Sequence, residues 1–255
     1  METRPAAGGL IAAAAAKNSP PDGYTLLGGA LTTVTPIFVK DNPIVASKEL
    51  APVSIVAIGG FFVYVRADLG ANSLAELAAY GKANSGKLRF ATTSGANTAL
   101  AAVVAKRLGF EFQPIPYKTT DQTVVALLNG ECDFAITQLA GFAPYLQNGK
   151  IRAVASLGAT RTRLMSSVPS AVEQGVPIEI YPSQAIWAPL GTPREVIEKL
   201  NAAINDAVKS PATVDRISKV SMIAAGSTPD ELVRQFESET RIYGEAAALV
   251  GLKPE

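Results

Sequence analysis

Short apolar runs alternate with polar turns and helical patterns along most of the chain. Each run has the length of a buried strand. We expect strands at residues 24–27, 53–58, 61–65, 88–91, 112–115, 132–136, 151–156 and 185–190. Strands that alternate with helices predict an α/β fold with mainly parallel sheets flanked by helices.

Capping residues mark where several helices begin. Ser73 with Glu76 predicts a helix that ends near residue 83, and Ser170 with Glu173 forms the same pattern. Proline in the first turn strengthens two further helix starts. The remaining helices are expected at 10–16, 98–108, 121–128, 142–147, 192–209 and 228–248, the last two opened by Thr192-Pro193 and Thr228-Pro229.

The chain length allows one large domain or two small ones. No shift of composition marks a boundary between them. The apolar runs 61–65 and 185–190 are candidates for chain crossings between two lobes. We therefore expect a discontinuous first lobe of residues 1–65 plus 186–255 and a second lobe of residues 66–185.

Composition excludes several classes of function. The chain has 23 Lys+Arg against 22 Asp+Glu, so it lacks the basic character of a general nucleic-acid binder. It has no histidine, which rules out Ser-His-Asp catalysis and His-ligated metal sites. The single cysteine, Cys132, forms no internal disulfide and is expected to be a small buried hydrophobe. We expect no cofactor, no metal and no enzymatic activity.

The segment 88–108 carries the most informative chemistry. It is predicted to be a strand, a loop of small polar residues and a helix, and the loop includes Thr93, Ser94 and Asn97. The first N–H groups of a helix have no partner within it and carry a partial positive charge, so they suit a carboxylate or a phosphate. The plainer alternative is a helix cap that binds nothing. No Walker A loop and no Gly-x-Ser-x-Gly elbow is present.

Weaker candidates are expected near the carboxyl ends of predicted strands, where open α/β sheets bind ligands. Tyr117-Lys118 follows one strand, and Asp133 lies on another. For Lys118 the alternative is a solvated side chain, and for Asp133 it is an edge charge. Trp187 is more typical of a core residue than of a stacking platform.

Several motifs, in order along residues 2–255, resemble the Bug family of periplasmic solute receptors. These receptors are the TctC-like binding components of tripartite tricarboxylate transporters. The motifs are Glu2-Thr3-Arg4-Pro5-Ala6-Ala7-Gly8-Gly9, Pro21-Asp22-Gly23-Tyr24-Thr25-Leu26-Leu27, Leu50-Ala51-Pro52-Val53-Ser54, Pro116-Tyr117-Lys118, Gly191-Thr192-Pro193, Lys199-Leu200-Asn201 and Gly251-Leu252-Lys253-Pro254-Glu255.

The resemblance implies a two-lobed periplasmic-binding-protein fold of type II. It also implies a monomeric periplasmic receptor that closes over a small organic carboxylate and delivers it to the membrane permease subunits of its transporter. The family pattern often has a second glycine where Asn97 stands. The ligand-binding residues implied are Ser94, Gly95, Ala96, Asn97, Thr98, Thr32, Thr33, Tyr117, Lys118, Asp133, Thr137, Ser183 and Gln184.

Members of this family begin with a signal peptide and then a strand, a Pro/Gly-rich loop and a helix. The present sequence begins after that unit, and its apolar segment 10–16 is too short for a signal peptide. We expect weak ligand binding, or none, from a chain without the unit.

Two other functions stay open at this point. An effector-sensing domain of a transcription regulator shares the two-lobed architecture, but it would carry a helix-turn-helix with a basic helix. A histidine-independent α/β enzyme would need another base, such as a lysine, beside Ser94.

Overall fold

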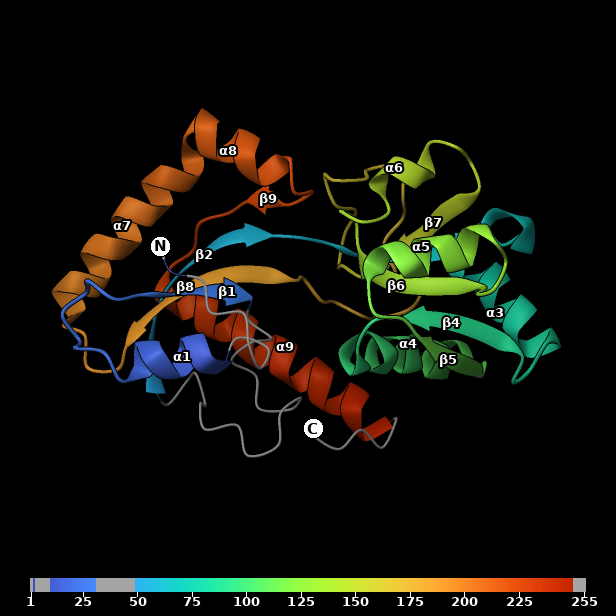
Figure 1. The fold of residues 1–255 in the computed structure, drawn as a ribbon, viewed down its shortest axis with the longest axis horizontal. Coiled ribbons are helices and arrows are strands. Elements are labelled where there is room, and N and C mark those ends of the chain that lie inside the picture. Colours follow the sequence, from blue (N-terminus) through green and yellow to red (C-terminus); the bar gives the residue numbers. More distant parts are fainter. Residues whose placement is uncertain (1, 3–9, 31–48, 250–255) are drawn as a thin grey trace. The chain divides into compact units, whose positions relative to one another are not determined.

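A computed structural model describes residue 2 and residues 10–30 and 49–249 of the chain (Figure 1). The chain forms two compact units. Unit 1 consists of Met1–Ile58, Pro182–Ile242 and Lys253–Glu255, and unit 2 consists of Gly59–Tyr181 and Tyr243–Leu252. The chain thus leaves unit 1 after Ile58 and re-enters it at Pro182, whereas the sequence suggested divisions after residues 65 and 185.

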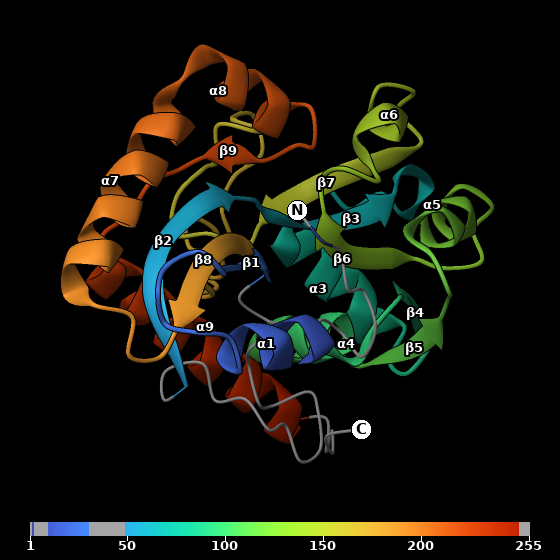
Figure 2. The ribbon, with the colours of Figure 1, turned by 60° about the vertical axis from the view of Figure 1, so that its left-hand side comes forward.

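Unit 1 contains an antiparallel sheet. Its strands are β1 (Leu27–Ala30), β2 (Leu50–Ile58), β8 (Ser183–Pro189) and β9 (Ile223–Ala224), in the order β1-β8-β2-β9. Figure 2 shows β1, β8 and β2 side by side. Strand β2 carries the chain out of unit 1 and β8 carries it back, and because the two are neighbours they run in opposite directions.

The helices of unit 1 are α1 (Leu10–Lys17), α7 (Arg194–Lys209), α8 (Pro211–Ser218) and α9 (Pro229–Leu249), and α9 continues into unit 2 from Tyr243. Trp187 of β8 is 1% exposed and meets Phe236 of α9 edge to face, with ring centroids 5.7 Å apart. Ala13 and Ala16 of α1 belong to the same cluster. The expectation that Trp187 is a core residue is confirmed.

Helix α7 is tied to the irregular strand β2 by asparagine side chains. The pairing of β2 with β8 shifts register between Pro52 and Ser54. Asn201 Nδ2 donates to the Val53 and Ser227 carbonyls, each at 2.7 Å. Backbone groups that a bulge leaves without a strand partner need another acceptor or donor. The Lys199-Leu200-Asn201 motif therefore has a structural explanation within unit 1.

The signature around Gly23 also has a local explanation. Asp22 Oδ1 accepts a hydrogen bond from the N–H of Tyr24 at 3.0 Å. Gly23 has φ +85°, and a Cβ there would lie 2.4 Å from Val196 Cγ1. Because the turn extends to Tyr24, which is 93% exposed, β1 begins at Leu27 instead of residue 24.

Unit 2 contains a mixed sheet. Its strands are β3 (Phe61–Arg66), β4 (Leu88–Thr92), β5 (Phe112–Pro116), β6 (Phe134–Gln138) and β7 (Ile151–Ser156), in the order β5-β4-β6-β3-β7. Strand β4 is parallel to β5 and β6, while β3 is antiparallel to β6 and β7. The α/β class is confirmed, but the described sheets are antiparallel or mixed instead of mainly parallel.

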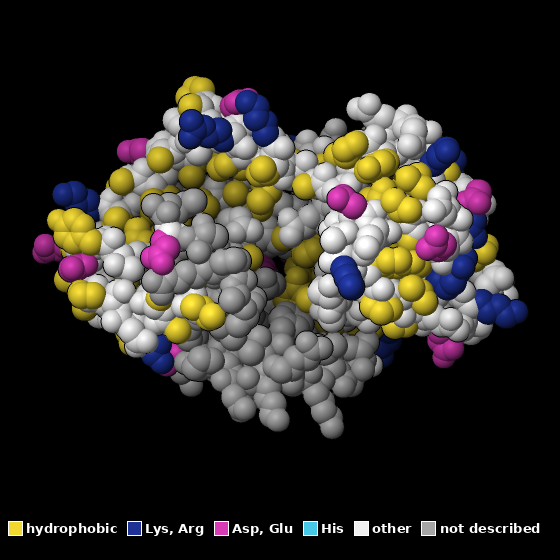
Figure 3. All heavy atoms as spheres, viewed as in Figure 1, with side chains coloured by type: hydrophobic (Ala, Val, Ile, Leu, Met, Phe, Trp, Pro, Cys, Tyr) yellow, Lys and Arg dark blue, Asp and Glu magenta, His cyan; other side chains and the backbone are white. Residues whose placement is uncertain are grey.

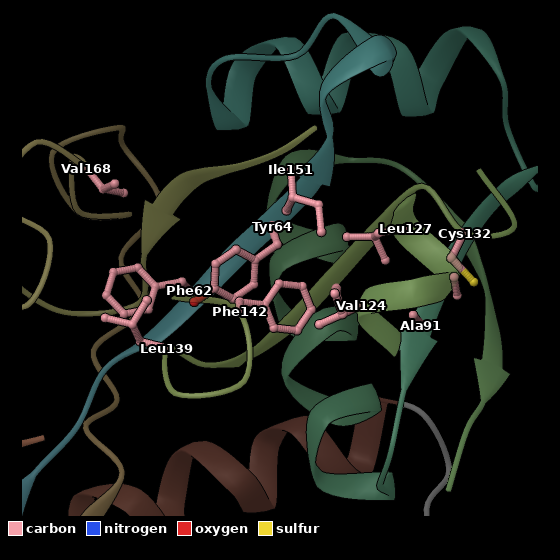
Figure 4. Packing of buried hydrophobic residues seen from close by; sticks show 12 residues of the cluster. Phe62, Tyr64, Ala91, Val124, Leu127, Cys132, Leu139, Phe142, Ile151 and Val168 are labelled. Atoms are coloured by element: carbon pink, nitrogen blue, oxygen red, sulfur yellow. The ribbon is translucent and has the colours of Figure 1, made fainter. Parts of the chain in front are cut away.

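The helical elements of unit 2 are the 3-10 turn η3 (Ala67–Leu69) and helices α3 (Leu74–Ala83), α4 (Gly95–Leu108), α5 (Thr120–Leu128) and α6 (Ala143–Leu146). Helices α4 and α5 lie on opposite faces of the sheet (Figure 1). Under α5, Tyr64 of β3 stacks on Phe142 with ring centroids 4.1 Å apart, and Val124 and Leu127 of α5 complete the cluster (Figure 4).

Most helix starts match the expected caps. The side chain of Ser73 accepts from the N–H of Glu76 at 3.2 Å. The N–H of Thr228 donates to the Glu231 carboxylate at 2.7 Å, and the N–H of Glu231 donates back to Thr228 Oγ1 at 3.2 Å. The prediction of Thr192 as a cap is wrong, because its hydroxyl donates to the Pro189 carbonyl and α7 begins at Arg194.

Candidate functional site

The carboxyl ends of three parallel strands form one edge of the unit 2 sheet. Strands β4, β5 and β6 end at Thr92, Pro116 and Gln138. The loops that follow β4 and β5 lead into α4 and α5, and the N–H of Tyr117 donates to the Thr92 carbonyl at 2.8 Å. This is the edge at which open α/β sheets bind ligands.

The turn between β4 and α4 is held by its own hydroxyl groups. The buried Thr92 hydroxyl donates to the Ser94 carbonyl at 2.9 Å. Thr98 Oγ1 lies 3.1 Å from both Thr92 Oγ1 and the Ser94 carbonyl oxygen. Ser94 Oγ accepts from the N–H of Asn97 at 3.2 Å. Ser94 is therefore the N-cap, and α4 begins at Gly95, three residues before the start that the sequence predicted.

Two donors at this helix start have no protein partner in the described part of the chain. The N–H of Asn97 is used by Ser94 Oγ, and the N–H of Thr98 donates to the Ser94 carbonyl. The N–H groups of Gly95 and Ala96 lie between them, in the first turn of a helix where no intrahelical acceptor exists. Ser94 and Gly95 are exposed, and the first turn contains no acidic residue. The start of α4 is thus an accessible site of partial positive charge.

The start of α5, at the same edge, is different. Thr119 Oγ1 accepts from the N–H of Gln122 at 3.3 Å. A Cβ added at Gly141 would lie 2.4 Å from Thr120 Cγ2, so the loop after β6 approaches this helix start closely. The first turn of α5 also carries the acidic Asp121, which disfavours a bound anion, whereas the first turn of α4 carries no acidic residue.

Tyr117 is turned away from the start of α4. Its hydroxyl lies 3.4 Å from Glu131 Oε2 and 3.5 Å from Cys132 Sγ, and Cys132 precedes β6 at the opposite edge of the sheet. Burial, and after it the contact with Cys132, raises the pKa of the Tyr117 phenol well above its usual range. Tyr117 and Lys118 line an open hollow of about 530 Å³ beside α5, with Pro116, Asp121, Gln122, Val125 and Glu131.

Asp133 lies at the edge of the sheet opposite Ser94, so the expected placement at a strand's carboxyl end is wrong. It precedes β6, and its carboxylate is 5% exposed. Oδ1 accepts from Arg66 Nε at 3.0 Å, and Oδ2 accepts from the N–H of Arg89 at 2.7 Å. A buried carboxylate needs charge partners. Through its bonds to Arg66 of β3 and Arg89 of β4, Asp133 holds the start of β6 to these two strands, at the edge opposite Ser94.

The other predicted residues are distributed over both units. Thr137, the second-to-last residue of β6, is half-buried near the same edge as Ser94. Ser183 and Gln184 begin β8 in unit 1, and the Ser183 hydroxyl hydrogen-bonds the carboxyl of Glu239. Thr32 and Thr33 lie outside the described residues.

Sequence reasoning missed Glu239. This residue of α9 is 2% exposed, and burial raises its pKa to about 8. A signal was available, because Leu232, Phe236 and Tyr243 recur at helical spacing on the same face as this acid.

Cys132 is buried, and burial raises the pKa of its thiol, as expected for an unreactive small hydrophobe.

Within residues 10–30 and 49–249 no group of three His, Cys, Asp or Glu side chains is placed to hold a metal ion. None of the helices in those ranges combines the length and the apolar character needed to cross a bilayer. On the face drawn in Figure 3, basic and acidic side chains are interspersed on each unit.

Comparison with known proteins defines the class. Rpa4515 of R. palustris, solved with adipate, is 24% identical with a TM-score of 0.78 and covers 97% of this chain and 84% of its own. MatC (Rpa3494) from Rhodopseudomonas palustris, solved with bound malate, is 24% identical with a TM-score of 0.71 and covers 94% of this chain and 84% of its own. The fold is that of a periplasmic solute-binding protein.

The family follows from the sequence matches. Residues 1–222 match the TctC family, described as the tripartite tricarboxylate transporter family receptor. Protein BugT of Bordetella pertussis is 31% identical over 237 residues, which are 91% of this chain and 73% of BugT. The chain belongs to the TctC family of tripartite tricarboxylate transporter receptors. The predicted resemblance and the receptor function are confirmed.

Proposed function

We propose that this receptor captures a small organic carboxylate at the start of α4 and delivers it to the permease subunits of a tripartite tricarboxylate-type transporter. The observation that carries the proposal is the pair of adjacent N–H groups of Gly95, which is exposed, and Ala96, which is half-buried; neither has an acceptor among the described residues. Two adjacent N–H groups at a helix start match the two oxygens of a carboxylate, and the helix dipole favours its negative charge.

The chemistry at this site is binding. The Ser94 hydroxyl oxygen already accepts from the N–H of Asn97, so its proton is available to donate to a ligand oxygen. Hydrogen bonds to a charged group contribute about 1.5–3 kcal/mol each. Three such donors explain how this edge can hold an acid without a lysine or arginine in the turn. The half-buried Thr137 and the exposed Lys118 are further contacts in this proposal.

Two observations on related proteins support this ligand class. The structures that share the fold include Rpa4515 with adipate and MatC with malate. Both ligands are small dicarboxylates, so the same class is proposed here. We also propose that capture takes place in the periplasm by a monomeric receptor with release to the permease; the family's description as a transporter receptor supports the transport step.

A thermal-shift screen tests this function on the chain as it stands. Malate, adipate and a panel of monocarboxylates are compared with the neutral diamides of the same carbon skeletons. Of the two outcomes that the sequence left open, weak binding or none, this proposal requires weak binding. We therefore expect at least one acid to raise the unfolding temperature at millimolar concentration, while its diamide leaves the temperature unchanged. Equal shifts for acid and diamide, or no shift with any acid, would contradict the proposal.

A further inference from the structure

Glu239 is a carboxyl group enclosed within unit 1. Its side chain accepts a hydrogen bond from Gln235 Nε2 at 3.0 Å and a second from the Ser183 hydroxyl. The residue is 2% exposed. These two neutral donors are the partners that the structure gives it among the described residues. A buried carboxylate without a cation is costly, so this environment favours the neutral acid.

Among the described residues, the elements packed around Glu239 supply no compensating charge. Helix α9 packs through Leu232 and Phe236 against α1, β1, β2 and β8. Strands β1, β2 and β8 contain no ionisable residue, and the one charge on α1, Lys17, pairs with Glu49 at 2.5 Å. On α9, the buried phenol of Tyr243 lies one turn further along the face of Glu239. The charged residues of α9 other than Glu239 are exposed: Asp230, Glu231, Arg234, Glu237, Arg241 and Glu245.

The position of this contact along the chain is informative. Ser183 directly follows the point at which the chain re-enters unit 1, and its register partner in β2 is Ile58, the last residue before the chain leaves. Glu239 lies one helical turn before Tyr243, where α9 passes out of unit 1. The Glu239–Ser183 hydrogen bond therefore joins a helix to a strand at the place where both connect to the rest of the chain.

We propose that Glu239 is a pH-sensitive link of unit 1: as a neutral acid it is stably enclosed between α9 and the first residue of β8, and on releasing its proton to solvent it becomes a buried charge that destabilises the packing of α9 at that place. This inference goes beyond the proposed function, because it needs neither the start of α4 nor any ligand. Its consequence is a receptor whose connecting elements are held more firmly below neutral pH than above it.

The sign of the pH dependence follows from the raised pKa. Burial raises the pKa of Glu239 from 4.5 to about 8, so the folded protein keeps a proton that the unfolded chain has lost. The stabilisation is complete below about pH 4.5. It declines as the pH rises and is lost once the pH passes about 8.

Glu239→Gln tests the link, with Glu237→Gln on the exposed side of α9 as the matched control. Thermal unfolding is followed from pH 5 to pH 9 for both variants and the unchanged protein. We expect Glu239→Gln to unfold roughly 10 °C higher than the unchanged protein at pH 9 and at nearly the same temperature at pH 5. Glu237→Gln is expected to follow the unchanged protein throughout. Parallel curves for Glu239→Gln and the unchanged protein would overturn the proposal.

The single tryptophan provides a second readout that does not depend on how stable the variants are. Trp187 lies on β8 and contacts Phe236, three positions before Glu239. We expect its fluorescence to titrate near pH 8 in the unchanged protein and in Glu237→Gln, and to be flat there in Glu239→Gln. A transition that persists in Glu239→Gln would contradict the proposal. Neither experiment contains an organic acid, so their failure would leave the proposed carboxylate function standing. Failure of the acid screen would likewise leave the proposal for Glu239 standing.

Discussion

The hydroxyl oxygen of Ser94 accepts a hydrogen bond from the backbone N–H of Asn97 at 3.2 Å. This contact closes the first turn of α4 and fixes the direction of the two N–H groups between the residues, those of Gly95 and Ala96. The same side chain is therefore both the cap of the helix and a neighbour of its unpartnered donors. Its removal is expected to affect stability and ligand binding separately.

Ser94→Ala is expected to weaken the binding of the best organic acid about tenfold, or ~1.4 kcal/mol, because one hydroxyl donor and the order of the turn are lost. Loss of the cap is expected to lower the free energy of unfolding by about 1 kcal/mol. Calorimetric titration and urea unfolding measure the two effects.

Ser73→Ala is the control for this substitution. Ser73 caps α3 through the N–H of Glu76 at the same 3.2 Å distance, but away from the candidate site. We expect a similar loss of stability and an unchanged dissociation constant for this variant. If Ser94→Ala binds the acid as tightly as the unchanged protein, Ser94 is only a cap.

Asp133→Asn is expected to lower the free energy of unfolding by about 3 kcal/mol, because it leaves Arg66 beside an uncharged amide at a buried site. Asp68→Asn is the matched control, since Asp68 pairs with the same Arg66 at 2.7 Å but is 73% exposed. Exposed pairs contribute less than about 1 kcal/mol. Urea unfolding compares the variants, and equal losses would show that burial of Asp133 does not determine its contribution.

Asn201→Ala is expected to lower the free energy of unfolding by about 2 kcal/mol, since the Val53 and Ser227 carbonyls lose a shared donor. Lys199→Ala changes an exposed neighbour on the same helix and is expected to stay within about 0.5 kcal/mol of the unchanged protein. Chemical denaturation of both variants measures the two free energies of unfolding. If Asn201→Ala left the free energy of unfolding unchanged, the bulged strand β2 would not depend on its hydrogen bonds to α7.

Elements with local signals were predictable from the sequence. Strand β7 spans Ile151–Ser156 as predicted, and α3 begins directly after the predicted cap Ser73. Helix α8 was missed although Ser210 caps it and Pro211 occupies its first turn, because Ser210 alone separates it from the end of α7 at Lys209. The antiparallel partners of β8 were not predictable, since pairing depends on where the chain crosses between units.

The candidate site was predicted in part for the same reason. The turn at Ser94 was identified because helix starts and small polar loops have local signatures. Asp133 was misplaced because its partners Arg66 and Arg89 are distant in sequence and meet it only in the folded sheet. The direction of the Tyr117 ring and the burial of Glu239 likewise depend on tertiary packing.

Gly95→Pro tests the central claim most directly. Proline is well tolerated at the first position of a helix, and the extended conformation of Ser94, with φ −160° and ψ 156°, suits the residue before a proline. The substitution therefore removes one unpartnered N–H while preserving the helix. Gly95→Ala, which adds a side chain but keeps the N–H, is the control.

The measurement is a calorimetric titration with the acid that gives the largest thermal shift. We predict that Gly95→Pro binds it at least about tenfold more weakly than Gly95→Ala does. Equal dissociation constants for the two variants would contradict the claim that the backbone donors at the start of α4 hold the ligand.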